Sequence, residues 1–426
     1  MTVAWFFIAL VGLMALNVPI AFCMAGVALG YVLITGTVPI ELIVQRMISG
    51  TDSFVLLAIP FFLLAGSLMN AGGVTHRLMT FARSLVGHIT GGLAHVTVVT
   101  NMIMAGMSGS AVADCSGTGA ILIPAMIRDR YSPAFAAAIT ATAATIGPII
   151  PPSIPMVIYA AIVNVSVARM FVGGFIPGVL MGLFLMTIAY VVSKRRGYPK
   201  EPRATLREMA RGTKESILAL LMPAIVLGGI LLGIFTPTEA AVVAALYAFV
   251  LGAFVYRELK PRHLLGVAQE VIVGTASAML ILAGATPFGW LLASERAPQT
   301  VAAAFSVFSE PWMLLLAVNI LLLILGCFME AVSILIILSP VLAPIVAAAG
   351  INDAHFGVIL VLNLMIGTVT PPVGILMYIV CRIANVSIVE FAHEAWFPIV
   401  GLIAVLFLIT YVPPLVTWLP NLILSH

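Results

Sequence analysis

Apolar runs long enough to cross a lipid bilayer fill most of this 426-residue chain. A spanning helix needs about 20 consecutive apolar residues, and in hydrocarbon only helices and closed barrels satisfy their backbone polar groups. Charged residues make up 8% of the sequence, against about 25% in an average soluble domain. We therefore expect an all-α polytopic membrane protein.

Composition and motifs argue against several other classes. The net charge of +3 gives nucleic acid little attraction, and no nucleotide-binding loop indicates ATP hydrolysis. Cys23, Cys115, Cys327 and Cys381 lie in or beside apolar segments without metal-ligand spacing. We interpret them as packing residues and expect neither a transition metal nor an organic cofactor. The first run, residues 3–16, is interpreted as a retained span rather than a signal peptide.

The most polar stretch, residues 194–215, divides the chain into nearly equal halves. It reads KRRGYPKEPRATLREMARGTKE and holds eight of the nineteen Lys and Arg residues. Loops rich in Lys and Arg stay in the cytoplasm. We therefore predict a cytoplasmic basic linker over residues 194–216.

The two halves repeat one pattern of small residues and prolines. At a spacing of 220 the sequence matches Gly106 with Gly326, Ala111 with Ala331, Val112 with Val332, Pro124 with Pro344, Gly147 with Gly367, Pro151 with Pro371 and Pro152 with Pro372. Asn-Val-Ser at 164–166 recurs at 385–387, after one additional residue. This colinear series indicates an internal duplication, with repeats over residues 1–193 and 217–426.

Each repeat is expected to contain five crossings and one hairpin that does not cross. The hairpins are predicted near 91–127 and 312–347, and the helices that follow them, near 133–160 and 355–380, are broken by prolines. An odd number of crossings gives the two repeats opposite orientations. The predicted fold is an inverted-topology repeat with two re-entrant hairpins and two discontinuous helices.

The distribution of charge agrees with this count. With the linker inside, sixteen Lys and Arg residues face the cytoplasm, and only Arg46, Arg169 and Arg296 face outward. Both termini are then predicted to be periplasmic, and the two hairpins enter from opposite faces.

The broken helices point to a binding site. TIGPIIPPSIP at 145–155 and MIGTVTPPVGI at 365–375 place prolines where a helix interior tolerates them badly. Non-helical backbone at membrane depth persists only when it is buried in protein or lines a wet cavity. Inverted repeats with broken helices are typical of secondary transporters, whose site lies where the repeats meet.

The first hairpin carries one acid in a segment of small residues, GMSGSAVADCSGTGA. A carboxylate at membrane depth, here Asp114, is typical of a functional site, although small residues also serve close helix packing. Ser108 and Ser110 supply hydroxyls. The tip is expected to meet the break at Gly147 and Pro148.

The second hairpin, GCFMEAVSILIILSP, has Glu330 and Ser333 at its tip. We expect this tip to face Gly367, Thr368 and Thr370 in the second break. Carbonyl and hydroxyl oxygens suit a hard cation, and unwound carbonyls coordinate Na⁺ in transporters of this type. Two equivalent tips predict two or more Na⁺ ions.

Two charged positions outside the hairpins have alternative interpretations. Arg46, with Asp52 nearby, either binds a substrate carboxylate or snorkels to lipid headgroups. Glu239 is either a gate or ion residue or, as we favour, the acid in the first turn of a helix that follows Thr236.

Gly106 to Gly109 also match the G-x-S-G pattern of intramembrane serine proteases. Proteolysis needs a histidine base beside Ser108. Only His355 and His393 follow at plausible positions, and both lie near predicted membrane boundaries. Proteolysis also leaves the duplication unexplained, so we expect no enzymatic activity.

Four segments of the chain are GGLAHVTVVTNMIMAGMSGSAVAD, FAAAITATAATIGPIIPPSIPMVIY, GIFTPTEAA and HFGVILVLNLMIGTVTPPVGI. Together they resemble the large membrane subunit of TRAP (tripartite ATP-independent periplasmic) transporters. The resemblance extends over essentially the whole chain. It implies an elevator-type, Na⁺-driven importer in the bacterial inner membrane. It also implies two partners, a small four-helix membrane subunit and a periplasmic substrate-binding protein that delivers an organic acid.

The resemblance also implies specific site residues. The Na⁺ ligands it suggests are Ser108, Gly109, Ser110, Asp114 and Gly147 in the first repeat, and Gly326, Glu330, Gly367, Thr368 and Thr370 in the second. Glu330 departs from the family, which favours Asp there. The residues expected to bind substrate are Arg46, Asp52, Ser108, Pro148, Ser153 and Ser333.

The sequence thus predicts Na⁺-coupled import of a carboxylated solute, such as a C4-dicarboxylate, a sialic or other sugar acid, or a 2-oxo acid. The small subunit is expected to be a separate chain, and lipid surrounds the assembly. A stand-alone Na⁺/carboxylate symporter is the main alternative. A passive channel or scaffold and the protease are the others.

Overall fold

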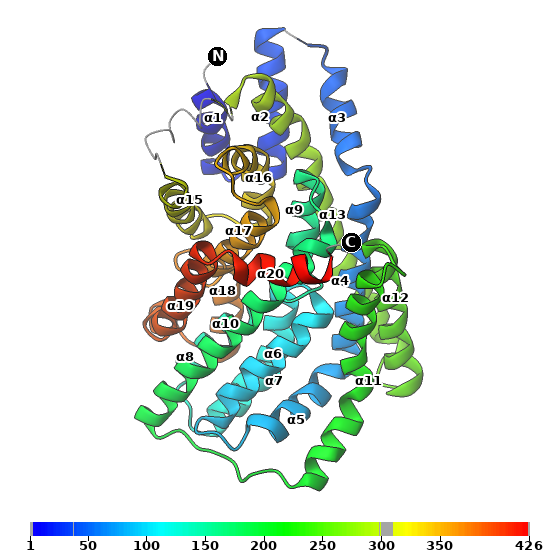
Figure 1. Cartoon of the computed structure of the whole chain (residues 1–426), viewed down its shortest axis with the longest axis vertical. Coiled ribbons are helices and arrows are strands. Elements are labelled where there is room, and N and C mark those ends of the chain that lie inside the picture. Colours follow the sequence, from blue (N-terminus) through cyan, green and yellow to red (C-terminus); the bar gives the residue numbers. More distant parts are fainter. Residues whose placement is uncertain (1–2, 37, 298, 300–309, 425–426) are drawn as a thin grey trace.

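The structure is a computed structural model that describes residues 3–36, 38–297, 299 and 310–424, and within these residues all regular secondary structure is helical (Figure 1). Seven of the described helical segments are long and apolar enough to cross a membrane. The expectation of an all-α polytopic membrane protein is therefore confirmed.

The N-terminal part contains more helices than the sequence predicts. The α-helices are α1 (Val3–Ala15), α2 (Ile20–Thr35), α3 (Glu41–Thr51), α4 (Ala58–Ala71) and α5 (Val74–Val86). A short 3₁₀ helix, η1 (Phe54–Leu57), precedes α4. Neither α3 nor α5 was expected as a helix. In α5 the buried residues Val74, Leu78 and Ala82 recur every fourth position, which is the pattern of a helix with one apolar face.

The next elements form the first hairpin and the first broken helix. They are α6 (Gly92–Ser108), α7 (Ala111–Arg128), α8 (Pro133–Ala144), α9 (Ile154–Val163) and α10 (Val167–Arg196). At 1.5 Å per residue, α8 is about 18 Å long and α9 about 15 Å. Each is about half of the roughly 30 Å needed to cross hydrocarbon, so the break separates two half-helices.

The second half begins with α11 (Leu206–Leu231), α12 (Pro237–Val250), η2 (Leu251–Val255) and α13 (Pro261–Ser294). It continues with α15 (Pro311–Gly326), α16 (Ala331–Ala348), α17 (Asp353–Gly367), α18 (Ile375–Ala384), α19 (Ile388–Tyr411) and α20 (Pro414–Ile423). Helix α19 ends at Tyr411, and α20 is a separate short helix. Glu239 forms a capping box with Thr236 at the start of α12, which confirms its structural role.

The helices repeat with the spacing found in the sequence. The second hairpin helices α7 and α16 begin at Ala111 and Ala331, 220 residues apart, whereas α9 and α18 begin at Ile154 and Ile375, 221 apart. The additional residue therefore lies inside the second break. Asn164 and Asn385 both adopt left-handed backbone angles, with φ of 60° and 53°, at the ends of these half-helices.

The linker is shorter than the predicted 194–216. Helix α10 continues to Arg196, and α11 begins at Leu206 because Thr205 and Glu208 form a capping box. The sequence T-x-x-E predicts such a helix start, and only residues 197–205 are non-helical.

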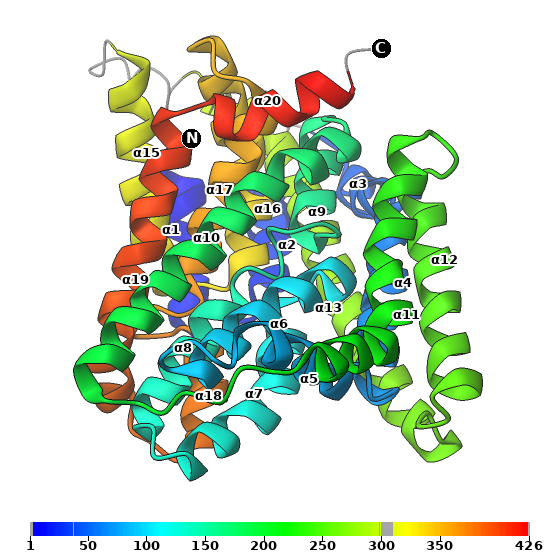
Figure 2. The same ribbon diagram turned by 60° about the horizontal axis from the view of Figure 1, so that its bottom comes forward.

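The linker is bonded to the elements beneath it. The N–H of Gly91 donates to the carbonyl of Pro199 at 3.1 Å, and the N–H of Glu201 donates to the carbonyl of Gly87 at 3.0 Å. The Glu201 carboxylate also pairs with Arg83 of α5 at 2.7 Å. In Figure 2 the linker crosses the lower end of the molecule and α20 lies across the upper end.

The two repeats interleave rather than forming separate bodies. Helix α7 of the first hairpin packs against α18, a half of the second broken helix. Helix α16 of the second hairpin packs against α9, a half of the first broken helix. A second group of contacts joins α4 to α12 and α13. The hairpins and broken helices thus form one cluster, and α4 and α13 lie beside it.

Candidate functional site

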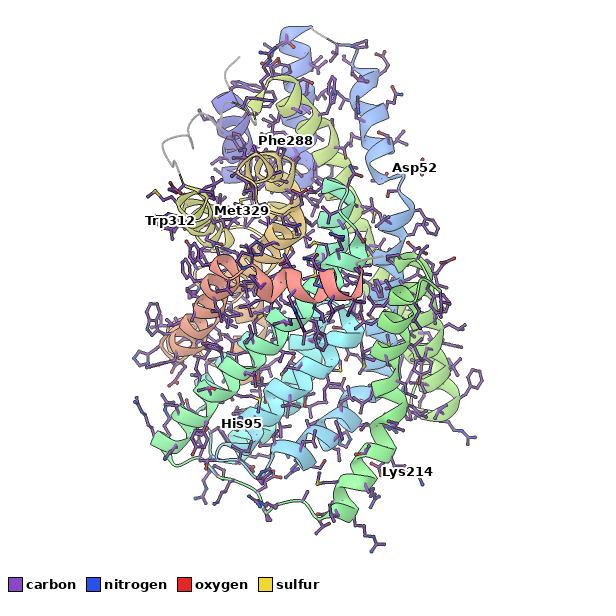
Figure 3. All side chains as sticks on the ribbon, viewed as in Figure 1. Asp52, His95, Lys214, Phe288, Trp312 and Met329 are labelled. Carbon is purple, nitrogen blue, oxygen red and sulfur yellow. The ribbon has the colours of Figure 1, made fainter. Side chains whose placement is uncertain are left out.

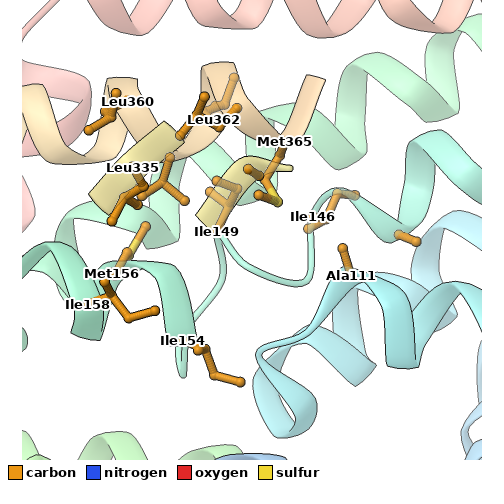
Figure 4. Close-up of a cluster of buried hydrophobic side chains, with 14 of the residues drawn as sticks. Ala111, Ile146, Ile149, Ile154, Met156, Ile158, Leu335, Leu360, Leu362 and Met365 are labelled. Carbon is orange, nitrogen blue, oxygen red and sulfur yellow. The ribbon is translucent and has the colours of Figure 1, made fainter. Parts of the chain in front are cut away.

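The first break is fixed by proline and serine. Pro148, Pro151 and Pro152 have no N–H to donate, so the chain cannot continue as a helix through them; the Pro151–Pro152 bond is cis. The Ser153 hydroxyl donates to the carbonyl of Pro148 at 2.5 Å and accepts from the N–H of Met156 at 3.2 Å, which starts α9. Figure 4 shows this unwound segment passing between the labelled side chains of α16 and α17 and the tip of the first hairpin.

The tip of the first hairpin touches this break. Gly109 turns the chain between α6 and α7 with a φ of 60°, a conformation that favours glycine. A Cβ atom on Gly109 would lie 2.7 Å from the carbonyl oxygen of Pro152. Ser110 begins α7 by accepting from the N–H of Ala113 at 3.4 Å. The predicted meeting of tip and break is therefore present.

Asp114 holds a buried carboxylate at this contact. It has no exposed surface, and its Oδ1 accepts from the Ser108 hydroxyl at 2.5 Å. Its Oδ2 has no hydrogen-bond partner in the described part of the chain. A Cβ atom on Gly147 would lie 2.5 Å from that Oδ2, so the oxygen faces the break directly.

A buried, unpaired carboxylate oxygen is costly unless a counter-charge compensates it. The groups around Asp114 are the Ser108 hydroxyl and the unwound backbone at Gly147, which are hard oxygen ligands suited to Na⁺ rather than to a soft metal. The residues present therefore fit a Na⁺ ion. Across the described ranges, no group of three His, Cys, Asp or Glu side chains could hold a metal ion.

The second tip also contacts its break, through two glycines. A Cβ atom on Gly326 would lie 3.1 Å from the Cα of Gly367, so the two backbones touch. The N–H of Val373 donates to the carbonyl of Cys327 at 3.1 Å. Pro371–Pro372 is cis, as in the first break.

The carboxylate of the second tip has a different role. Glu330 is exposed and caps α16: Oε1 accepts from the N–H of Val332 at 3.0 Å, and Oε2 accepts from the N–H and the hydroxyl of Ser333 at 2.8 and 3.0 Å. The negative charge at this N-terminus suits the helix dipole. Glu330 thus caps the N-terminus of α16, and the Ser333 hydroxyl donates its hydrogen bond to the Glu330 carboxylate.

Thr368 and Thr370 supply the polar groups of the second break. Their hydroxyls donate to the carbonyls of Met365 at 2.6 Å and Ile366 at 2.7 Å. A hydroxyl that donates one hydrogen bond keeps lone pairs with which to bind a cation. Both side chains are half-buried, so this site is more open than the one at Asp114.

A cavity of about 180 Å³ lies between the two tips. Its polar and backbone lining comes from both tips and both breaks, and includes Gly109, Ser110, Pro148, Glu330 and Thr368. The opposite wall comes from α4 and α13, through Ile59, Leu63, Gly274 and Ala278. Sequence analysis did not identify this wall, because its residues are typical of any apolar span.

A second cavity, of about 330 Å³, adjoins the first. Three of its lining residues, Ile162, Leu282 and Ile336, lie one helical turn beyond Ile158, Ala278 and Val332 of the first cavity. Ser49, Ser53 and Thr286 add hydroxyl groups. The two cavities follow the same three helices, α9, α13 and α16.

Arg46 belongs to this second region rather than to the tips. Its guanidinium lies over the Trp290 ring, 5.0 Å from the ring centroid, and Trp290 lines the second cavity. Arg46 forms no ion pair with any described residue. Asp52 is exposed at the end of α3 and lines neither cavity (Figure 3). The structure therefore does not place Asp52 among the lining residues.

Three buried polar side chains behind the second break were also missed. Asn363 of α17 donates to Asn319 Oδ1 at 2.9 Å, and Asn319 donates to the Thr410 hydroxyl at 3.0 Å. The remaining Asn363 oxygen has no partner among the described residues. An amide inside an apolar span was the signal that could have identified them.

The serine of the G-x-S-G pattern, Ser108, is bonded to a carboxylate rather than to the histidine base that proteolysis needs. The Ser108 hydroxyl is bonded to Asp114, and the buried His355 ring nitrogen lies 2.8 Å from the carbonyl of Ile409. A serine whose proton is held by a carboxylate at a hairpin tip matches an ion ligand better than a nucleophile.

Comparison with known proteins identifies the relatives of this chain. It is 42% identical over 416 residues to the sialic acid TRAP transporter large permease protein SiaM of Vibrio cholerae, covering 97% of each chain. It is 41% identical over 377 residues to the C4-dicarboxylate TRAP transporter large permease protein DctM of Pseudomonas aeruginosa, covering 88% of each. It is also 41% identical to the isethionate TRAP transporter permease protein DctMQ of Oleidesulfovibrio alaskensis, over 94% of this chain and 63% of that one.

A solved structure has a similar fold. The Alcanivorax borkumensis YdaH transporter matches 86% of each chain with a TM-score of 0.63 and 15% identity. The family profile described as "Tripartite ATP-independent periplasmic transporter, DctM component" matches residues 7–415. With that match and these relatives, the chain belongs to the DctM component family and is a large membrane subunit of a TRAP transporter.

Proposed function

We propose that this subunit couples the inward movement of Na⁺ to the import of a carboxylated organic anion. The observation that carries the proposal is the pair of hairpin tips, each in contact with a broken helix, that together border one cavity. The unpartnered Oδ2 of Asp114 beside Gly147 supports the cation at the first tip.

In this proposal one Na⁺ binds at each tip. Ser108, Asp114 and the backbone at Gly147 hold the first ion, with Gly109 and Ser110 closing the tip around it. Gly326, Gly367, Thr368 and Thr370 hold the second, and Glu330 keeps α16 in position by capping it. Each ion draws its tip and its break together, which shapes the cavity between them.

The substrate occupies the cavity between the tips. Ser110, Glu330, Thr368 and the backbone at Pro148 are among the polar groups that line it. Ser153 fixes the loop that presents Pro148. Arg46 lies over Trp290, a lining residue of the adjoining cavity, and attracts the anion before it reaches the tips. Na⁺ and substrate must each raise the affinity of the other by the same factor, because the linkage is thermodynamic.

We further propose an elevator mechanism in which the hairpins and broken helices move against α4 and α13. The wall that α4 and α13 present to the first cavity is formed by Ile59, Leu63, Gly274 and Ala278. Such a surface has no hydrogen bonds to break when the other side moves. The inverted repeat, the cytoplasmic linker and the periplasmic termini complete this proposal.

The family supports two partners for this chain. The relatives SiaM and DctM are named large permease proteins, and DctMQ is a single permease protein longer than this chain. We propose a separate small membrane subunit and a periplasmic binding protein, in the bacterial inner membrane. A stand-alone symporter is the competing proposal, since this chain alone contains both tips.

Uptake into proteoliposomes tests the proposal. The vesicles contain this chain and the small subunit, and each of a panel of labelled anions (sialic acid, a C4-dicarboxylate, a 2-oxo acid and isethionate) is supplied with its binding protein. We expect uptake that requires both an inward Na⁺ gradient and the binding protein. Uptake that needs Na⁺ but no binding protein indicates a stand-alone symporter, and uptake that ignores Na⁺ contradicts the coupling.

A further inference from the structure

A groove that the transport site does not use lies at the linker end of the molecule, between the end of α10 and the start of α19. Its volume is about 230 Å³. The walls include the apolar side chains Ile188, Val191 and Phe397. The mouth includes Arg195, Arg196 and His393. The groove therefore has an apolar part and a cationic part.

The cationic part carries an excess positive charge. Arg196 is paired with Glu394 at 2.9 Å and also contacts the Tyr198 hydroxyl. Arg195 is exposed and forms no ion pair with any described residue. Two arginines against one glutamate leave one net positive charge before the His393 ring is counted. An anion placed at the mouth would meet both guanidinium groups.

The apolar part is open to the surroundings of the protein. Val191 and Phe397 are 42% and 58% exposed, and the neighbouring Trp396 is 64% exposed. Tryptophan and tyrosine collect at the boundary between headgroups and hydrocarbon, so Trp396 marks the depth of the groove in the membrane. The walls thus lie where acyl chains begin and the mouth where headgroups lie.

We propose that this groove binds one anionic glycerophospholipid, with the headgroup phosphate against Arg195 and Arg196 and an acyl chain along Ile188, Val191 and Phe397. Charge selects an anionic headgroup, because basic pockets between membrane helices on the cytoplasmic side attract such lipids. Arginine can bind phosphate through two parallel hydrogen bonds. The lipid would join the helices that follow the two broken helices, one from each repeat.

Lipid titration followed by native mass spectrometry tests this proposal. The purified chain in detergent is mixed with phosphatidylglycerol or with phosphatidylcholine of the same acyl chains. We expect one tight phosphatidylglycerol adduct and no comparable phosphatidylcholine adduct. Arg195→Gln should weaken the adduct about fivefold, the factor that corresponds to about 1 kcal/mol for one arginine at an anionic surface.

Two further variants keep the test decisive. Val191→Trp fills the groove without changing its charge and should also weaken the adduct. Arg207→Gln removes an exposed arginine of α11 outside the groove and should leave the adduct unchanged, and melting curves confirm that each variant is folded. Equal binding of the two lipids, equal effects of Arg195→Gln and Arg207→Gln, or displacement by glycerol phosphate would overturn the proposal.

Discussion

The two hairpin tips have the same architecture but place their carboxylates differently. Helices α7 and α16 begin at equivalent residues, yet the first tip carries its acid at Asp114, inside the first turn, and the second carries it at Glu330, at the cap. Asp114 is buried against the break with one free oxygen, while Glu330 is exposed with both oxygens bonded. One turn of helix therefore separates a buried carboxylate that faces the break from an exposed carboxylate that caps a helix.

The two breaks also differ in burial, and the first break is again the more buried one. Every residue from Thr145 to Ser153 is buried, whereas Pro372 and Val373 of the second break are exposed. The additional residue of the second break lies in this exposed segment. A carboxylate in a sealed site needs a counter-charge or a proton, whereas water can solvate a carboxylate in an open site. The two halves thus contain one buried and one more exposed version of the same arrangement.

Removing the buried charge should have the largest effect. Asp114→Asn keeps the shape of the side chain but takes away the anion, and a hydrogen bond or contact to a charged group contributes about 1.5–3 kcal/mol. We expect the Na⁺ concentration for half-maximal uptake to rise by at least about tenfold. Initial rates of uptake in proteoliposomes against Na⁺ concentration measure this.

The matched variant is Glu330→Gln, which alters the exposed carboxylate. We expect its Na⁺ dependence to stay within about twofold of the wild type, because the amide oxygen can still cap α16. Equal losses in the two variants would show that the tips are chemically equivalent and would break the comparison.

The glycines of the two breaks should separate stability from ion binding. A Cβ atom on Gly367 would lie 2.7 Å from both the Cα and the carbonyl oxygen of Gly326, and backbone cannot move aside locally. Gly367→Ala is expected to destabilise the protein by about 1–3 kcal/mol, seen as a lower melting temperature. In Gly147→Ala the closest atom belongs to the Asp114 side chain, so we expect less destabilisation and a larger loss of Na⁺ affinity.

Gly30→Ala supplies the control for this pair. Gly30 lies inside α2, and a Cβ atom there meets nothing within 4 Å. Alanine is the better helix former by about 0.5–1 kcal/mol, so this variant should be as stable as the wild type or more so. A melting temperature for Gly367→Ala equal to that of Gly30→Ala would mean that the second tip and break are not in firm contact.

A smaller effect is expected at Ser153, which has no side-chain counterpart at Gly374. Ser153→Ala loses the bond to the Pro148 carbonyl and the cap of α9, which typically contributes about 0.5–2 kcal/mol. Ser166→Ala removes an equivalent cap from α10, where the bond to Arg169 N–H is exposed and 3.4 Å long, and should cost less. Chemical or thermal unfolding measures both, and a larger loss for Ser166→Ala would contradict the role assigned to Ser153.

The positions of the tips and breaks could be predicted from the sequence because glycine and proline change the backbone wherever they occur. The 220-residue spacing then aligned the tip and break of one half with those of the other. The starts of α7 at Ala111 and α16 at Ala331 have this same spacing. The amphipathic helices α3, α5 and α20 were missed because they are too short to read as spans. The capping role of Glu330 depends on the backbone of the tip, which composition does not reveal. The separation of Arg46 from the tips depends on how α3 packs against α13.

The linker between α10 and α11 sets a maximum stroke for any movement of the first hairpin. Glu201 is bonded to Gly87 and Arg83, just before the hairpin begins, and α11 starts only five residues later, at Leu206. Five extended residues reach roughly 17 Å. Gly87 is therefore tethered to the start of α11 through Glu201. To move farther from Leu206 than this length allows, the protein must first break the bonds of Glu201 to Gly87 and Arg83.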